Sequence, residues 1–213
     1  QMYLDDTLGI HIPAPNLTRI ASEYSVEEFE RAVRQGVGRD GRGYFFMPSP
    51  MYANLSDTQL GQILAFLRQL PEAPDAYEGR SFGLYYRWDL YNGDAHHITD
   101  EMADVIRVPG VDAADSHSRG RYMAMTTCTQ CHGPDLQGRD DWTRPPSLEV
   151  VQVYSLEEFR HLLKTGEPIG TRKARAMRIA SQRRFINFTE QEIRDLYGYL
   201  TGDEFKEWLA INY

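Results

Sequence analysis

The sequence lacks long apolar runs, and it contains only two cysteines in 213 residues. No stretch of about 18 apolar residues is present, so the sequence predicts no membrane-spanning helix. The first ten residues do not show the basic and then apolar pattern of a secretory signal. Basic residues are not in excess either: the formal net charge is −8, which argues against nucleic acid as the main partner. What remains is an ordinary globular composition, long enough for one large domain or two small ones.

The two cysteines lie close together, and a histidine follows the second one directly. Cys128, Cys131 and His132 form the motif CxxCH. A redox CxxC usually begins a helix after a strand, in a strand–helix alternation that this sequence does not show. A structural zinc site needs four ligands, and no second CxxC or HxxxH pair is present. The pattern therefore favours covalent haem c, in which both thiols add to the haem vinyl groups and the adjacent imidazole binds the iron.

One segment of the chain is repeated. YSVEEFERAVRQG at 24–36 matches YSLEEFRHLLKTG at 154–166, so the repeat is 130 residues away, from 24 to 154. Ser25 and Ser155 are each followed three residues later by glutamate, which predicts a capping box at the start of a helix. A glycine closes each copy, as expected for the end of a helix.

The same spacing extends beyond this helix. Met47 and Met177 are related by the same offset, from 47 to 177. After the methionines, each copy ends in a second capped amphipathic helix, at 56–70 and at 189–200. The sequence therefore contains two related helical units.

The predicted fold class is all-α, with two tandem helical domains joined by an irregular linker. No β-rich segment stands out. The predicted domains are residues 1–70, a linker at 71–118 that is rich in Tyr, Asp, Gly and Pro, and residues 119–213.

The sequence resembles class I c-type cytochromes, and specifically the tandem cytochrome c domains of bacterial electron-transfer subunits. The resemblance is carried by GRYMAMTTCTQCHGPDLQG around the CxxCH, by PPSL at 145–148, by Met177 and by the final helix FTEQEIRDLYGYL. The second unit matches over its whole length, whereas the first matches only the later two thirds of such a domain. The resemblance implies an electron carrier rather than an enzyme.

This family resemblance also implies the ligands of the iron. It assigns His132 and Met177 as axial ligands of a covalent haem, and Met47 as the corresponding methionine of the first unit. His161 is the rival to Met177, but it lies within a predicted helix. A proline carbonyl, from Pro145 or Pro146, accepts the proton of the iron-bound histidine in this family.

The first unit keeps Met47 but has no CxxCH in this sequence. One interpretation is that the CxxCH lies upstream of residue 1, so that a second haem binds near Met47 and the protein is a dihaem cytochrome. The alternative is a degenerate unit that has lost its haem and serves as a scaffold. Retention of MPSPMYANLSD, at 47–57, favours the first interpretation.

The segment at 171–188 is basic and contains no acidic residue. Around Met177 it is interpreted either as a solvated loop or as a rim that guides an acidic redox partner. The basic residues are Arg172, Lys173, Arg175, Arg178, Arg183 and Arg184. The remaining histidines have no companion at metal-binding spacing; they are His11, His96, His97 and His117.

The function expected from the resemblance is transfer of single electrons between redox proteins, one candidate partner being a membrane-bound respiratory or photosynthetic complex. Because haem is attached outside the cytoplasm in bacteria, the resemblance also implies a periplasmic or exported protein. Two alternatives stay open. The chain is the cytochrome subunit of a dehydrogenase, or it is a dihaem oxidoreductase that acts on a small substrate.

Overall fold

The structure is a computed structural model of the chain. It describes residues 2–3, 10–45, 47–74, 81–93, 101–108, 110–139, 144–171 and 173–211. His96, His97 and Arg172 lie outside these ranges. The chain divides into two compact units, Gln1–Val105 and Ile106–Tyr213, and the boundary falls within the segment predicted as a linker.

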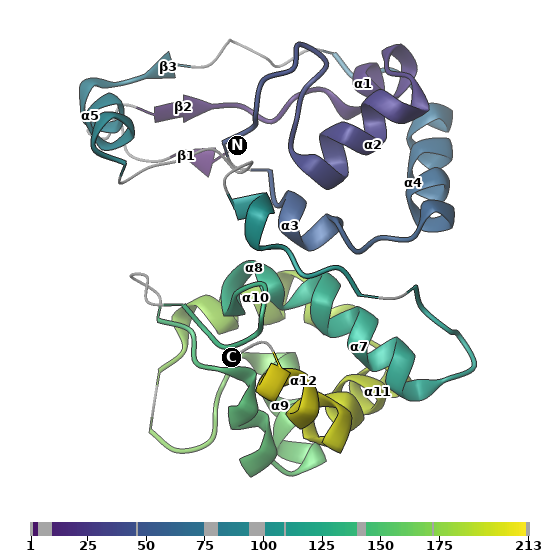
Figure 1. Cartoon of the computed structure of the whole chain (residues 1–213), viewed down its shortest axis with the longest axis vertical. Coiled ribbons are helices and arrows are strands. Elements are labelled where there is room, and N and C mark those ends of the chain that lie inside the picture. Colours follow the sequence, from purple (N-terminus) through teal and green to yellow (C-terminus); the bar gives the residue numbers. More distant parts are fainter. Residues whose placement is uncertain are drawn as a thin grey trace. The chain divides into compact units, whose positions relative to one another are not determined.

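Unit 1 combines helices with a small antiparallel sheet (Figure 1). Its strands are paired in the order β1-β2-β3, with Tyr3 opposite His11 and His11 opposite Ser81. A small buried cluster lies between the helices and contains Ala21, Phe29, Leu60 and Leu64. The elements of unit 1 are β1 (Met2–Tyr3), β2 (Ile10–Ile12), α1 (Leu17–Glu23), α2 (Val26–Gln35), α3 (Ser49–Tyr52), α4 (Asp57–Gln69), β3 (Ser81–Phe82), α5 (Leu84–Asn92) and the 3-10 helix η1 (Met102–Asp104).

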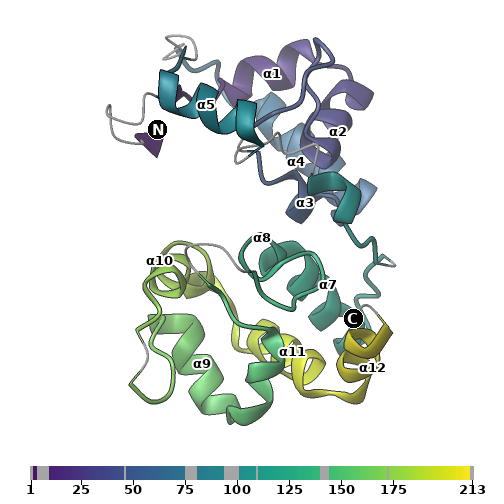
Figure 2. The same cartoon turned by 60° about the vertical axis from the view of Figure 1, so that its left-hand side comes forward.

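In unit 2 the described elements are all helical, and they enclose a larger core (Figure 2). Tyr199, Phe205 and Met125 are among its fully buried side chains. The elements of unit 2 are α7 (Ser116–Thr127), α8 (Thr129–His132), η2 (Leu148–Val153), α9 (Leu156–Thr165), α10 (Arg175–Arg183), η3 (Phe185–Asn187), α11 (Glu190–Thr201) and α12 (Asp203–Ile211).

The repeated helices begin and end as the sequence predicts. In α2 the backbone N–H of Glu28 donates to Ser25 Oγ at 3.1 Å, and the Glu28 carboxylate accepts from the Ser25 backbone. The first turn of α9 has the same reciprocal pair, formed by Ser155 and Glu158. Both helices end at a glycine in the left-handed conformation, where a side chain would be strained. The capping boxes are confirmed, and they define equivalent starts for the two copies.

In unit 2, the first helix packs closely against a helix near the C-terminal end of the unit. Helix α7 packs along α11, and both are side by side in Figures 1 and 2. A Cβ on Gly120 would lie 2.2 Å from the Asp195 carbonyl oxygen and 2.7 Å from Tyr199 Cβ, so only glycine allows this approach. Beside the crossing, Arg119 Nε donates to the buried Asp195 carboxylate at 2.6 Å. The sequence analysis identified neither feature.

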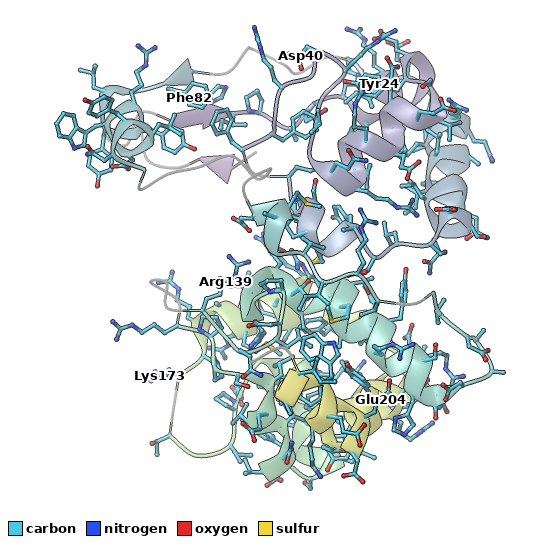
Figure 3. The ribbon with its side chains drawn as sticks, in the orientation of Figure 1. Tyr24, Asp40, Phe82, Arg139, Lys173 and Glu204 are labelled. Carbon is cyan, nitrogen blue, oxygen red and sulfur yellow. The ribbon has the colours of Figure 1, made fainter. Side chains whose placement is uncertain are left out.

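The helical fold class is confirmed, but two details differ from the expectation. The sheet in unit 1 was not predicted, because strands of two or three residues are too short to show an alternating pattern. The segment predicted as an irregular linker contains β3 and α5. There the Phe82 ring lies 4.9 Å from the Phe45 ring and 5.5 Å from the Tyr86 ring, centroid to centroid. Figure 3 shows Phe82 on this sheet.

Candidate haem site

The cysteine motif occupies one helical turn at the end of α7. Helix α7 is capped at Cys128, and the backbone N–H of His132 donates to the Cys128 carbonyl at 2.9 Å. Both thiols are free; Cys128 is half-buried and Cys131 is exposed. Desolvation raises the pKa of the Cys128 thiol to about 11, although the contact with the Thr127 hydroxyl opposes this shift. This raised pKa disfavours the Cys128 thiolate on which a redox-active CxxC depends.

His132 is held by a backbone carbonyl on a different segment. Its Nδ1 lies 2.8 Å from the carbonyl oxygen of Pro146. A carbonyl only accepts hydrogen bonds, so the proton of the neutral ring must lie on Nδ1, which leaves the Nε2 lone pair available for a metal. Burial lowers the pKa of His132, and the hydrogen bond to Pro146 only partly opposes this effect. Both features favour the neutral, metal-binding form of the ring.

The segment after the motif is tied to the segment that carries the two prolines. The backbone N–H of Gly138 donates to the His132 carbonyl at 2.7 Å, and that of Leu148 donates to the Leu136 carbonyl at 2.9 Å. Gly138 has a φ of +94°, and a Cβ there would lie 2.5 Å from the Pro145 carbonyl oxygen. Glycine is therefore required at this contact, which sets the position of the proline carbonyls relative to His132.

The two prolines have different partners. The carbonyl of Pro145 accepts from the backbone N–H of Arg139 at 3.3 Å, whereas that of Pro146 faces His132. The sequence left the choice between them open. Of the two carbonyls, the one that contacts the imidazole is that of Pro146.

Met177 lies in a helix rather than in the expected loop. It is part of the first turn of α10, is partly buried, and packs against the core of unit 2. The position of α10 is fixed at Gly166, the glycine that ends α9. A Cβ on Gly166 would lie 2.1 Å from Arg178 Cα, so α9 and α10 are in backbone contact beside Met177. The rival ligand His161 is exposed, and its Nε2 lies 3.5 Å from a Glu167 carboxylate oxygen.

The basic segment at 171–188 includes α10, and after this helix it reaches the cysteine motif. Arg184 donates to the side-chain oxygen of Gln130 at 2.7 Å, and Gln130 lies between the two cysteines. Lys173, Arg175 and Arg183 are exposed. In the view of Figure 3, Arg139 and Lys173 lie on the same side of unit 2. Basic side chains therefore lie near the CxxCH turn, on the segment that also carries Met177.

The first unit holds the counterparts of the later part of this site. Met47 is partly buried and lies two residues before the start of α3, which follows α2 as α10 follows α9. The segment PNL at 15–17 aligns with the segment PSL at 146–148. The first segment comes before α2 in the chain, and the second comes before α9. The sequence analysis did not identify Pro15 as the counterpart of Pro146, although the P-x-L pattern that the two segments share could have revealed it.

Comparison with known proteins agrees with the site. Residues 118–202 match the family model described as Cytochrome c. The chain is 28% identical over 183 residues, covering 80% of it and 34% of the relative, to "Alcohol dehydrogenase (quinone), cytochrome c subunit" of Gluconobacter oxydans (strain 621H). It is 30% identical over 127 residues, covering 56% of it and 28% of the relative, to "Gluconate 2-dehydrogenase cytochrome c subunit" of Pantoea cypripedii. The chain thus spans about a third of the length of these relatives. Residues 118–202 form a cytochrome c domain.

Proposed function

We propose that unit 2 transfers single electrons through a haem c bound covalently to Cys128 and Cys131, with His132 and Met177 as the axial ligands. The observation that carries this proposal is the contact between His132 Nδ1 and the Pro146 carbonyl at 2.8 Å, next to a CxxC that forms one helical turn. It fixes the tautomer that leaves Nε2 available to bind iron.

The donor set of the described residues fits a haem c. It offers two free thiols, an imidazole with an available Nε2, and a half-buried thioether on α10. When bound, the haem iron supplies a one-electron couple, and a thioether ligand favours its ferrous state. The protein holds the imidazole ring through Pro146, limits water with the apolar core around Met177, and positions α10 through Gly166.

We propose the same ligand role for Met47 in unit 1. The support is the repeat of capping box, left-handed glycine and methionine in the same order in both units. In this account a second CxxCH, upstream of residue 1, holds a haem beside Met47. If unit 1 is instead a scaffold without haem, residues 1–213 carry one haem only.

We infer further that the chain acts as an electron-transfer subunit, outside the cytoplasm, next to a dehydrogenase. Both relatives are named cytochrome c subunits of dehydrogenases. The exposed basic side chains near the CxxCH turn fit an acidic face on the redox partner, since complementary charge steers encounter. No helix in the described ranges is long and apolar enough to span a bilayer.

The test is the ligation of the iron in the purified protein. Replacing Met177 by leucine should remove the thioether-to-iron charge-transfer absorption of the ferric protein and lower the reduction potential, while Met125→Leu in the core leaves both unchanged. Retention of the methionine signature in Met177→Leu would count against Met177. An exchangeable iron site that turns over a small substrate would instead support an enzyme.

A further inference from the structure

Lys164 joins two segments that lie 22 to 24 residues apart in the chain. It is a partly buried residue in the last turn of α9. Its Nζ donates to the carbonyl of Ile186 at 3.0 Å and to the carbonyl of Phe188 at 2.5 Å. Ile186 lies in η3, and Phe188 follows η3 directly. Hydrogen bonds from a charged donor are stronger than those between neutral groups, so Lys164 ties the end of α9 to the chain just before α11.

The same contact is present in unit 1, although the side chain differs. Arg34 occupies the place of Lys164 in the repeat, two residues before the glycine that ends the helix. Its Nη2 donates to the carbonyl of Leu55 at 2.5 Å and to the Asp57 carboxylate at 2.7 Å. Leu55 and Phe188 each directly precede the N-cap residue of the next helix, so they are equivalent positions. Two different cations thus bind the same backbone carbonyl in the two units.

The segment that this contact closes is the one that carries the methionine. In unit 2 it runs from Gly166 to Phe188 and contains Met177. Its first end is fixed at Gly166, where α9 and α10 are in backbone contact. Its other end is fixed by Lys164. Because η3 packs against both α9 and α10, the lysine holds an element that contacts the helix of Met177.

We propose that Lys164 is a positioning residue for the Met177 thioether. The proposal rests on the ligand role proposed for Met177, and Lys164 acts through η3 and α10. A segment closed at both ends has lost most of its conformational freedom, so little of the free energy of ligation is spent on ordering it. Without Lys164 the segment opens more often, and another ligand can take the place of the thioether. Ferric iron is affected first, because a thioether favours the ferrous state.

The test is the displacement of the thioether from ferric iron by free imidazole, followed by the loss of the thioether-to-iron charge-transfer absorption. Lys164→Ala removes both hydrogen bonds and keeps a good helix former in α9. We expect the Kd for imidazole to fall about 10-fold, the change in an equilibrium constant that corresponds to one charged hydrogen bond. Lys164→Gln, which shortens the side chain and removes the charge, is a second variant and should shift the Kd in the same direction. Lys164→Arg should keep the wild-type Kd, because arginine makes this contact in unit 1.

Lys206→Ala is the matched control, because Lys206 Nζ lies 3.0 Å from an Asp203 carboxylate oxygen within α12. It removes the same charge and should leave the Kd unchanged. The free energy of unfolding in urea is measured for every variant. The proposal is overturned if Lys164→Ala lowers this free energy but keeps the wild-type Kd, since the lysine then only supports the fold. It is also overturned if Lys206→Ala changes the Kd equally, or if Lys164→Arg behaves like Lys164→Ala.

The Met177→Leu variant separates this proposal from the function proposed for unit 2. In that variant Lys164→Ala should leave the imidazole Kd unchanged, because no thioether remains to be displaced. A change there would show that Lys164 acts by another route and would overturn the proposal. If Met177→Leu keeps the methionine signature, the ligand role itself fails. If Met177→Leu loses the signature while Lys164→Ala binds imidazole as the wild type does, only the role of Lys164 fails.

Discussion

Replacing Gly138 by alanine tests how the His132 ring is held. Gly138 has a φ of +94°, where an alanine side chain costs about 1 to 2 kcal/mol. In addition, the new Cβ would lie 2.5 Å from the Pro145 carbonyl oxygen and 2.9 Å from the Pro146 carbonyl carbon. Both contacts are with backbone, so the proline segment must move away. We expect the hydrogen bond from His132 Nδ1 to the Pro146 carbonyl to lengthen.

The size of the effect follows from that hydrogen bond. Donation to a carbonyl raises the basicity of the imidazole and stabilises ferric iron, so its loss raises the reduction potential. A bond with a net value of about 1 kcal/mol corresponds to about 40 mV for one electron, since a tenfold change equals about 59 mV and about 1.36 kcal/mol.

The assay is an equilibrium redox titration of the haem protein, with Gly170→Ala as the matched control. Gly170 also has a positive φ, of +78°, but a Cβ there would meet no atom within 4 Å. The control therefore reproduces the backbone strain without the contact. We expect Gly138→Ala to raise the potential by about 40 mV and Gly170→Ala to leave it unchanged. Equal potentials in the two variants would refute the reasoning.

Three further predictions follow from unit 2. Asp195→Ala should lower the free energy of unfolding at pH 7, measured in urea, because it removes the hydrogen-bonded partner of Arg119 beside the α7–α11 crossing. Desolvation raises the pKa of Asp195, but hydrogen bonds from Arg119 and a glutamine hold this pKa below its usual value. The stabilisation by the Arg119–Asp195 pair is therefore present above about pH 4, and it is lost as the pH falls through the lowered pKa. Gly166→Ala should displace α10 and weaken the methionine signature of Met177, seen in the ferric spectrum. Arg183→Glu should slow electron transfer with an acidic partner several-fold at low salt and have little effect at high salt, measured by stopped flow.

Much of the helical structure in both units could be predicted from local patterns. The capping boxes at Ser25 and Ser155 depend on residues three positions apart, so the sequence contains the whole signal. The CxxCH is equally local. Its one-turn geometry follows from the backbone hydrogen bonds that close on Cys128.

Contacts between distant segments could not be predicted in the same way. The sequence could not distinguish Pro145 from Pro146, because the choice depends on how Gly138 lets the proline segment approach. The Arg119–Asp195 pair joins residues 76 positions apart and leaves no periodic signal. The basic segment around Met177 was interpreted as a loop, and the short helix α10 was not predicted.

The central claim is tested most directly by mapping haem onto the chain purified from its native host. The protein is alkylated after unfolding, digested, and analysed by mass spectrometry. Our account predicts that the peptide with Cys128, Cys131 and His132 carries one haem and that neither cysteine is alkylated. Recovery of this peptide without haem, with both thiols alkylated, would contradict it.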